Sequence, residues 1–392
     1  MSGAVAALAT EMGPIGFEVF QAFASETDRS GLTGDEQFNF MLLGLFGEVG
    51  SLLSELKKKQ RDKNAYFAYA QSAQEETGDV LWYLANVATA LNLSLADLAS
   101  RAMVDSVGTG ATDFAGLQRQ DSLFQEPASS AHVQKSLLLV AARTGRLVRR
   151  AEEDADPSER ARDLSRIFAA LVAAASDAHI SLDRAARANV AKILDRWPLT
   201  RVYTPLFDDA FDHDEQLPRR LEVEFREKDV RGTKYVFQSV HGLHLGDRLT
   251  DNSADEDDYR FHDVFHLAYA ATLGWSPVLR ALLRLKRKSD RDLDEQQDGA
   301  RAVITEEGIS NWIFAHGLRH HAFKGVDSVD FQLLKTIRQM VKGYEVQVCP
   351  LWMWETAILR GFAVFRELKV RRRGLVIADL TTRTLTFQEL DP

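Results

Sequence analysis

The chain has 392 residues, of which 45% are hydrophobic and 9 are prolines, and its formal net charge at pH 7 is −9. This length exceeds that of one ordinary domain, so two or three domains are expected, and the composition is typical of a folded, helix-rich globular protein. The acidic balance argues against general binding to nucleic acids or membrane surfaces, although local basic stretches occur, such as RLKRKSDR and KVRRRG.

The cysteine content and the N-terminal sequence bear on the location of the protein. A single cysteine, Cys349, cannot form an intramolecular disulfide, which suits a reducing compartment. The N-terminal MSGAVAALATEMG lacks the basic region of a signal peptide and contains Glu11. No uncharged apolar run reaches the roughly 18 residues that a membrane-spanning helix needs. We therefore expect a cytoplasmic protein without membrane partners.

Apolar side chains recur with the period of an α-helix over residues 36–59 and 74–105, which predicts two long helices. The stretch that follows is rich in Gly, Ser, Asp and Gln, so we expect a linker over residues 111–133. The helical pattern then returns. The N-terminal part is therefore expected to contain a first helical domain, residues 1–110, and a second one, residues 134–198.

The second helical domain repeats part of the first. The sequence AHISLDRAARANV (178–190) is similar to LNLSLADLASRAM (91–103), at an offset of about 87 residues. In this register the second copy keeps the helical pattern but loses the acids, so it is expected to hold no metal ion of its own. Its arginines suit either a surface salt-bridge network or contacts with phosphate. At this offset Glu76 aligns with Asp163 and Asp79 with Arg166; with a shorter intervening loop in the second copy, Glu48 aligns with Arg143 and Ser51 with Arg146.

A change of character at Pro198 marks a third domain, residues 199–392, which begins with prolines and the acidic loop DDAFDHDEQ. Residues 221–240 alternate in the manner of β-strands on both sides of an Arg-Gly turn, which predicts a β-hairpin. The terminal GLVIADLTTRTLTFQEL predicts a second one. The expected fold class is mainly α, with tandem helical units followed by an α+β C-terminal domain. Helical patterns lie near residues 259–288, 296–323 and 329–368.

Three acids of the first helical domain are candidate metal ligands. Glu76 and Asp79 are three residues apart and share one face of a helix, and Glu48 is placed to come from the neighbouring helix. Acids in a first helical turn can also simply complement the helix dipole. Carboxylates gathered from two helices repel one another unless a divalent cation neutralises them, and hard oxygen ligands select Mg²⁺ or Mn²⁺.

The sequence segments around these acids resemble a known protein family. LLGLFGEVGSLLSELKKKQRD followed by EETGDVLWYLANVATALNLSLADLA resembles the MazG-type all-α nucleoside triphosphate pyrophosphohydrolases over roughly residues 36–105. The resemblance implies Mg²⁺-dependent cleavage of a nucleoside triphosphate to the monophosphate and pyrophosphate. It assigns metal binding and catalysis to Glu48, Glu76 and Asp79. Ser51 stands where the family has a further acid, which is a departure from its pattern.

The end of the second helical domain carries the same resemblance. MazG-type domains end with an asparagine and a lysine that reach the substrate, and ISLDRAARANVAKILDRWP resembles that ending. It implies that Asn189, Lys192 and Arg196 bind the substrate. A degenerate tandem would then build one complete site within a single chain. Because family members form helical dimers, the resemblance also allows a homo-oligomer through the helical units.

The C-terminal domain contains a second candidate site. DDYRFHDVFHLAYAA places His262, Asp263 and His266 within one helical turn, and the acid pair Glu306 and Glu307 could join them from another helix, with Glu306 as the named candidate ligand. Two histidines four residues apart can hold a transition metal, and HDxxH slightly resembles HD-type metal phosphohydrolases. A buried, hydrogen-bonded histidine cluster is the alternative interpretation.

The sequence thus leaves three functional hypotheses. The first is an Mg²⁺-dependent nucleotide pyrophosphohydrolase with an appended domain. The second is a nucleotide-sensing or regulatory binding protein, in which Ser51 and the arginines are signs of lost catalysis. The third places a metal-dependent hydrolase activity at the C-terminal HDxxH site. The base and sugar of the nucleotide depend on the shape of a pocket and are not predicted.

Overall fold

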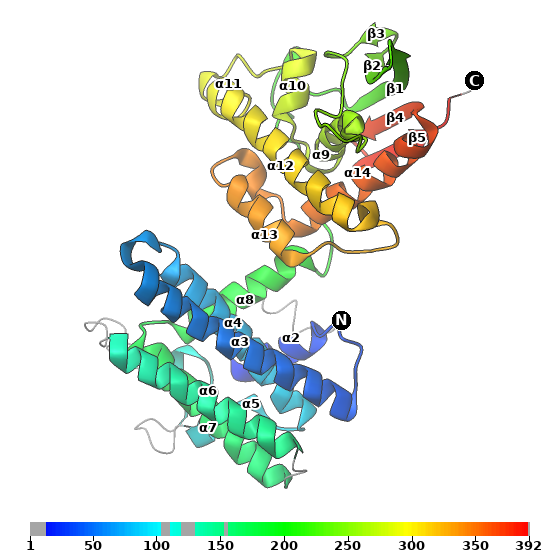
Figure 1. Ribbon diagram of the computed structural model, residues 1–392. Coiled ribbons are helices and arrows are strands. Elements are labelled where there is room, and N and C mark those ends of the chain that lie inside the picture. Colours follow the sequence, from blue (N-terminus) through cyan, green and yellow to red (C-terminus); the bar gives the residue numbers. More distant parts are fainter. Residues whose placement is uncertain (1–12, 103–109, 119–129, 153–155, 391–392) are drawn as a thin grey trace. The chain divides into compact units, whose positions relative to one another are not determined.

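The computed structural model describes the chain as two compact units, residues 1–199 and 200–392 (Figure 1). The predicted fold class is confirmed, because the described part of the N-terminal unit is helical and the C-terminal unit combines helices with an antiparallel sheet. No helix within the described ranges has both the length and the apolar character that crossing a bilayer requires. Parts of the predicted linker and the N-terminal segment lie outside the described residues, which are 13–102, 110–118, 130–152 and 156–390.

The helices of the N-terminal unit pack around one hydrophobic core. Aromatic rings lie near its centre, where Phe114 packs edge-to-face against Phe17 and Phe20 with centroids 5.1 Å apart in both pairs. The helices are α2 (Phe17–Glu26), α3 (Gly34–Asp62), α4 (Tyr69–Ala90), α5 (Leu95–Ala102), α6 (Ser130–Glu152), α7 (Pro157–Asp177) and α8 (Leu182–Arg196), with short 3-10 turns at Lys63–Ala65 and Ala115–Leu117.

The prediction of one helix over residues 74–105 is wrong, because the chain breaks between α4 and α5. Asn92 adopts a left-handed conformation there (φ 56°), which asparagine tolerates better than most residues. Gln21 then holds the turn: its side-chain amide donates to the Leu93 carbonyl (2.8 Å) and accepts from the Leu95 N–H (2.7 Å). The turn therefore caps the start of α5 with a side chain from α2.

The same turn recurs before α8. His179 takes the left-handed conformation (φ 57°), and Gln118 donates to the Ile180 carbonyl (2.9 Å) and accepts from the Leu182 N–H (2.8 Å). These residues occupy the positions that the repeated sequence aligns with the first turn. The helix packing is also reciprocal, because α4 packs against α8 while α7 packs against α5. The helix that follows each of these turns, α5 or α8, therefore packs on the helix that precedes the other turn, α7 or α4.

The C-terminal unit contains a five-stranded antiparallel sheet in the order β3-β2-β1-β4-β5, and both predicted hairpins are confirmed, as β1 with β2 and β4 with β5. The strands are β1 (Arg220–Val230), β2 (Thr233–Val240), β3 (Leu243–His244), β4 (Arg373–Asp379) and β5 (Thr384–Gln388), and the helices are α9 (Asp263–Leu273), α10 (Pro277–Leu283), α11 (Arg291–Gln296), α12 (Ala300–Arg319), α13 (Phe331–Met340) and α14 (Leu351–Arg371). Four 3-10 turns lie at His213–Glu215, Tyr259–Phe261, His321–Phe323 and Glu345–Val348.

Two of the helices predicted in the C-terminal unit are interrupted. The segment 259–288 divides after α9, where Gly274 is left-handed (φ 72°) and Pro277 begins α10. The segment 329–368 divides between α13 and α14, where Gly343 has a φ of 91° and Pro350 precedes α14. Glycine in this region ends a helix at little steric cost, and proline favours the start of the next one.

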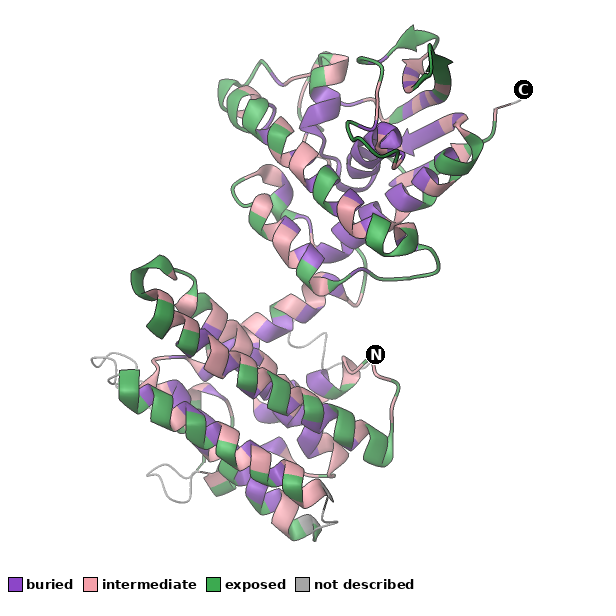
Figure 2. Cartoon of the chain, viewed as in Figure 1, coloured by how far each residue is buried: buried purple, intermediate pink, exposed green. Residues whose placement is uncertain are grey.

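Helix α9 is the central helix of the C-terminal unit. It is buried along its whole length, and it packs against β4, β5 and α14 (Figure 2). His262, Asp263 and His266 therefore begin a helix whose other residues are almost all apolar. Polar groups in such a position must find partners inside the protein, because unpaired buried polar groups are costly.

The cysteine provides a test of this core. Cys349 is 1% exposed, and burial raises the pKa of its thiol to about 11. The thiolate is the reactive form, so we expect an aromatic disulfide reagent to modify the native protein only as fast as it unfolds. Complete and rapid modification in denaturant is the control. Rapid modification under native conditions would contradict the burial of Cys349 in the core of the C-terminal unit.

Candidate functional site

The three predicted acids of the N-terminal unit lie together between α3 and α4. Glu48 comes from α3, and Glu76 and Asp79 lie one turn apart on α4. Each offers a carboxylate oxygen, and the three oxygens lie within 4.8 Å of one another. All three side chains are half-buried. The contact follows from the packing of the two helices, which brings residue 48 opposite the start of the apolar stripe on α4.

Burial and mutual repulsion both act on the pKa values of these carboxyl groups. Burial and the neighbouring carboxylates raise the pKa of Glu76 to about 7. Burial, followed by the charge of Asp79, also raises the pKa of Glu48. Carboxyl groups that share a site and are removed from water cannot all ionise cheaply. The cluster therefore has the properties of a cation site, in which a divalent ion would offset the repulsion.

Helix α8 adds a basic and a polar side chain to the cluster. The Asn189 side-chain amide donates to Asp79 Oδ1 (2.7 Å), and Lys192 Nζ donates to the same oxygen (2.5 Å). Lys192 also lies 3.9 Å from Glu75. The Arg196 guanidinium lies over Trp197, with the ring centroid 4.7 Å from the guanidinium carbon. Asn189 and Lys192 are the α8 side chains that contact Asp79.

A glycine allows this approach of α8 to α4. A Cβ atom on Gly78 would lie 2.4 Å from the backbone oxygen of Ala185 and 3.0 Å from the Cβ of Asn189. Only a residue without a side chain fits between the two helices at this point. Gly78 directly precedes Asp79, so the closest contact of the helices is also the point where Asn189 reaches the cluster.

We expect Gly78→Ala to destabilise the protein and to displace α8 from the acids. Forcing atoms into a packed contact costs about 1–3 kcal/mol, more than the roughly 1 kcal/mol that alanine gains in a helix. Gly50→Ala on α3 is the matched control, since an added Cβ there meets nothing within 4 Å. Thermal unfolding should show a lower midpoint for Gly78→Ala alone. Equal midpoints for both variants would contradict the close packing.

Ser51 and Glu55 continue the same face of α3 beyond Glu48. Ser51 supplies a hydroxyl where the resemblance leads one to expect an acid. Glu55 is 5% exposed, accepts a 2.6 Å hydrogen bond from Lys58, and also accepts one from the hydroxyl of Tyr66. The Glu55 carboxylate is therefore already neutralised by partners on its own side of the helix.

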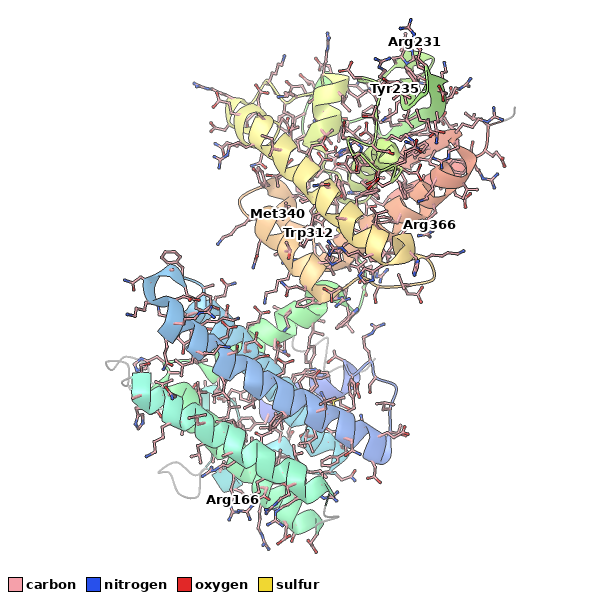
Figure 3. All side chains as sticks on the ribbon, in the orientation of Figure 1. Arg166, Arg231, Tyr235, Trp312, Met340 and Arg366 are labelled. Atoms are coloured by element: carbon pink, nitrogen blue, oxygen red, sulfur yellow. The ribbon has the colours of Figure 1, made fainter. Side chains whose placement is uncertain are left out.

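Helices α6 and α7 carry arginines around a buried acid. Asp163, on α7, is 2% exposed and is the residue aligned with Glu76. It pairs with Arg150 (2.5 Å), Arg166 (3.3 Å) and Arg146 (3.4 Å). Arg166 reaches out to the surface of the unit (Figure 3). The guanidinium of Arg143 donates to the Arg166 carbonyl oxygen (2.5 Å).

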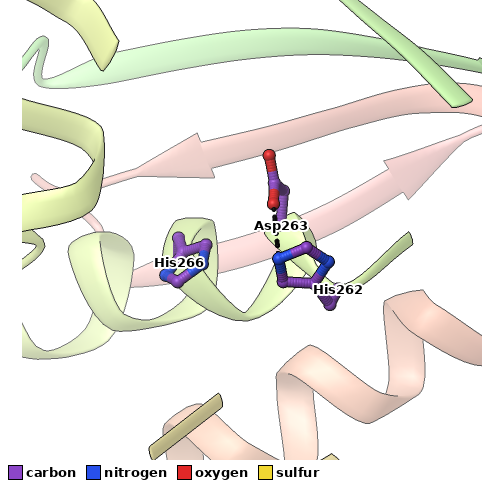
Figure 4. Close-up of side chains that lie close together, drawn as sticks. All are labelled: His262, Asp263 and His266. Atoms are coloured by element: carbon purple, nitrogen blue, oxygen red, sulfur yellow. Dashed lines mark ion pairs between the residues drawn. The ribbon is translucent and has the colours of Figure 1, made fainter. Parts of the chain in front are cut away.

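The C-terminal cluster is formed by consecutive turns at the start of α9 (Figure 4). One ligand atom from each of His262, Asp263 and His266 lies within 4.8 Å of the others. His262 Nε2 is 3.0 Å from Asp263 Oδ1. Burial lowers the pKa of His262, whereas the carboxylates of Glu306 and Glu307 raise the pKa of His266 well above its usual value despite its burial.

The structure places Glu306 behind His266 and brings Glu307 to the cluster instead. Glu306 Oε1 lies 2.8 Å from His266 Nδ1, and its Oε2 accepts from the Val278 N–H (2.8 Å). Glu307 Oε2 lies 3.5 Å from His266 Nε2 and 3.8 Å from His262 Nε2. The sequence indicated both acids but not which of them faces the cluster, because adjacent residues of one helix differ by about 100° in direction and the pattern does not fix which one faces α9.

The fold and these sites define an α-helical protein with a carboxylate cluster between packed helices, followed by an α+β domain. Residues 202–391 match the family model described as MazG C-terminal domain. The chain is also similar to Gene 37 protein of Mycobacterium phage L5, with 32% identity over 90 residues, which is 21% of this chain and 79% of the phage protein. The chain belongs to the MazG-like family. No solved structure matches it.

Proposed function

We propose that the protein is a divalent-metal-dependent nucleoside triphosphate pyrophosphohydrolase. The observation that carries the proposal is the meeting of three carboxylates from α3 and α4 with Asn189 and Lys192 from α8. Anionic oxygen ligands are the donors that Mg²⁺ and Mn²⁺ prefer. Membership of the MazG-like family supports a nucleotide substrate.

In this proposal Glu48, Glu76 and Asp79 hold Mg²⁺ or Mn²⁺. When bound, the metal supplies charge neutralisation on the phosphates and a lower pKa for a coordinated water. Lys192 donates one of its hydrogen bonds to the phosphate chain of the bound nucleotide in place of Asp79. The Asn189 amide continues to donate to Asp79 and keeps its carboxylate oriented. Glu75 lies 3.9 Å from Lys192 and is the carboxylate proposed to accept the proton of the attacking water.

The N-terminal unit is proposed to be a tandem with one competent site. The repeated glutamine-capped turns and the reciprocal helix packing support a duplication. In the second copy, Asp163 aligns with Glu76, and the arginines around it neutralise its charge. The first copy supplies the carboxylates and the second copy supplies Asn189 and Lys192, so both are needed for the proposed site.

The direct test is a panel of ribo- and deoxyribonucleoside triphosphates with Mg²⁺, scored for pyrophosphate against orthophosphate. We expect pyrophosphate and nucleoside monophosphate in equal amounts, and no product when the metal is removed with a chelator. Orthophosphate as the main product would indicate cleavage at another bond and would contradict the assignment.

A nucleotide-binding role without turnover is the second candidate, and Ser51 is the observation that favours it. The resemblance leads one to expect an acid at this position, and its loss removes one anionic ligand. A sensor would bind a nucleoside triphosphate in the presence of Mg²⁺ without forming pyrophosphate. If Ser51→Glu then produced turnover, loss of the fourth acid would explain the inactivity.

Self-association through the helical units is a further part of the proposal. Phe40, Leu43 and Phe46 lie on α3 and are 44%, 71% and 48% exposed, respectively. Burial of such side chains against a second copy would remove apolar surface from water. Light scattering on the purified chain measures the molar mass, and a monomer at all concentrations would exclude this part.

A further inference from the structure

We propose that the C-terminal unit contains a transition-metal site formed by His262, Asp263, His266 and Glu307. This site lies in a different unit from the acids of α3 and α4, and it does not depend on the function proposed for them.

The Nδ1 atom of each histidine makes a hydrogen bond on the side of the ring away from the cluster. His262 Nδ1 lies 2.9 Å from the Tyr259 carbonyl oxygen, which can only accept, so this nitrogen carries hydrogen. His266 Nδ1 lies 2.8 Å from the carboxylate of Glu306, which accepts in the same way. In the neutral rings the lone pairs are therefore on the two Nε2 atoms. This leaves the Nε2 atoms as the ligand atoms of a metal-binding tautomer.

The two Nε2 atoms face carboxylates instead of hydrogen-bond donors. His266 is 0% exposed, and among the described residues its Nε2 has no hydrogen-bond partner. Its near neighbour is Glu307 Oε2, at 3.5 Å. His262 Nε2 faces Asp263 Oδ1 at 3.0 Å. Without a metal, a contact between an imidazole nitrogen and a carboxylate oxygen needs a proton on the nitrogen. A bound cation would take the place of that proton and would be coordinated by the nitrogen and the carboxylate together.

The residues around the cluster fix the orientation of these ligands. Gln238, from β2, is 3% exposed and donates a 2.6 Å hydrogen bond to Asp263 Oδ2, the oxygen that does not face His262. The ring of Tyr259 stacks on His262 with centroids 4.1 Å apart. Ser276 donates to the Glu306 oxygen that faces His266 (2.7 Å). Metal-binding histidines are usually held by such carboxylate and carbonyl partners on the second ring nitrogen.

The donor set selects the class of metal. Two imidazole nitrogens and two carboxylates suit Zn²⁺, Mn²⁺ or Fe²⁺, whereas Mg²⁺ prefers an all-oxygen environment. Glu307 is 41% exposed at its side chain, while both histidines are buried. The ion would therefore lie at the edge of the unit, where water or an oxygen of a small anionic ligand can complete its coordination.

The test uses the full-length chain purified without chelator or affinity histidines. Elemental analysis is expected to find about one transition ion per chain. After removal of the ion, Co²⁺ serves as the probe, because its visible absorption reports nitrogen and oxygen ligation directly. Glu307→Gln, at a half-exposed position that tolerates the change, should weaken Co²⁺ binding by at least about tenfold.

His266→Ala should abolish the Co²⁺ spectrum, and circular dichroism shows whether this buried variant folds. The matched control is His244→Ala, which removes an exposed histidine of the same unit and should leave Co²⁺ affinity unchanged. Purified protein with no stoichiometric ion and no Co²⁺ absorption would overturn the proposal, as would wild-type affinity in Glu307→Gln. The cluster would then be a pair of buried, hydrogen-bonded histidines.

Discussion

Glu76→Gln is expected to reduce pyrophosphate release by at least about 10²-fold. Changes to the partners that support metal ligands typically cost 10- to 100-fold, and loss of a ligand charge should reach the upper end of that range. The substitution preserves the volume of the side chain, so the helices need not move. The measurement is the rate of Mg²⁺-dependent pyrophosphate formation at saturating nucleotide.

The same variant should be no less stable than the wild type in the absence of metal. The folded protein raises the pKa of Glu76 from 4.5 to about 7, so the folded state holds its proton over a range in which the unfolded chain has lost it. The contribution of this group to the free energy of unfolding therefore falls as pH rises between these two values. Glutamine cannot ionise, so it removes this loss of stability. Loss of activity with an unchanged or higher melting temperature separates a ligand role from a structural one.

Glu36→Gln is the matched control for this experiment, because it neutralises an exposed acid in the first turn of the same helix that carries Glu48. It should leave turnover unchanged. Near-wild-type pyrophosphate release by Glu76→Gln would refute the metal assignment for the whole cluster.

Lys192→Ala is expected to weaken nucleotide binding by about 1.5–3 kcal/mol, which corresponds to roughly a 10- to 150-fold change. Lys192 donates to Asp79 from a different helix, and charged hydrogen bonds of this kind have that magnitude. We expect the main effect on KM and on the dissociation constant of a non-hydrolysable nucleotide analogue, measured by calorimetry with Mg²⁺ present.

The control for Lys192 is Arg184→Ala, an exposed basic residue at the opposite end of α8. It removes the same formal charge from the same helix, so it reports general electrostatic attraction. Equal effects of the two variants would show that α8 contributes only its net charge. A nucleotide affinity unchanged in Lys192→Ala would exclude a site that combines α4 with α8.

The parts of the candidate sites that were predictable follow from spacing along single helices. Glu76 and Asp79 are one turn apart on α4, and His262 and His266 are one turn apart on α9, so the chain alone brings each pair to one face. The prediction that residues of α8 join those of α4 depended on the repeat and on the family resemblance, because no local pattern specifies which distant helices pack together.

The rest depends on tertiary packing and on helix ends. Left-handed residues at Asn92 and Gly274 divided helices that looked continuous by apolar period. Glu306 and Glu307 are adjacent on α12 and point in different directions. Which of them faces the cluster is therefore set by the packing of α12 on α9. The arginine partners of Asp163 also could not be read from sequence, because long side chains reach several neighbours from one backbone position.

The most direct test of the proposed site is the position of bond cleavage. Hydrolysis of a nucleoside triphosphate by the full-length protein with Mg²⁺, in heavy-oxygen water, should place the label on the nucleoside monophosphate and leave the pyrophosphate unlabelled. Mass spectrometry of the two products gives the result in one experiment. Label in pyrophosphate or orthophosphate would show attack at another phosphorus and would contradict a site in which the acids of α3 and α4 act with Asn189 and Lys192 on the α-phosphate.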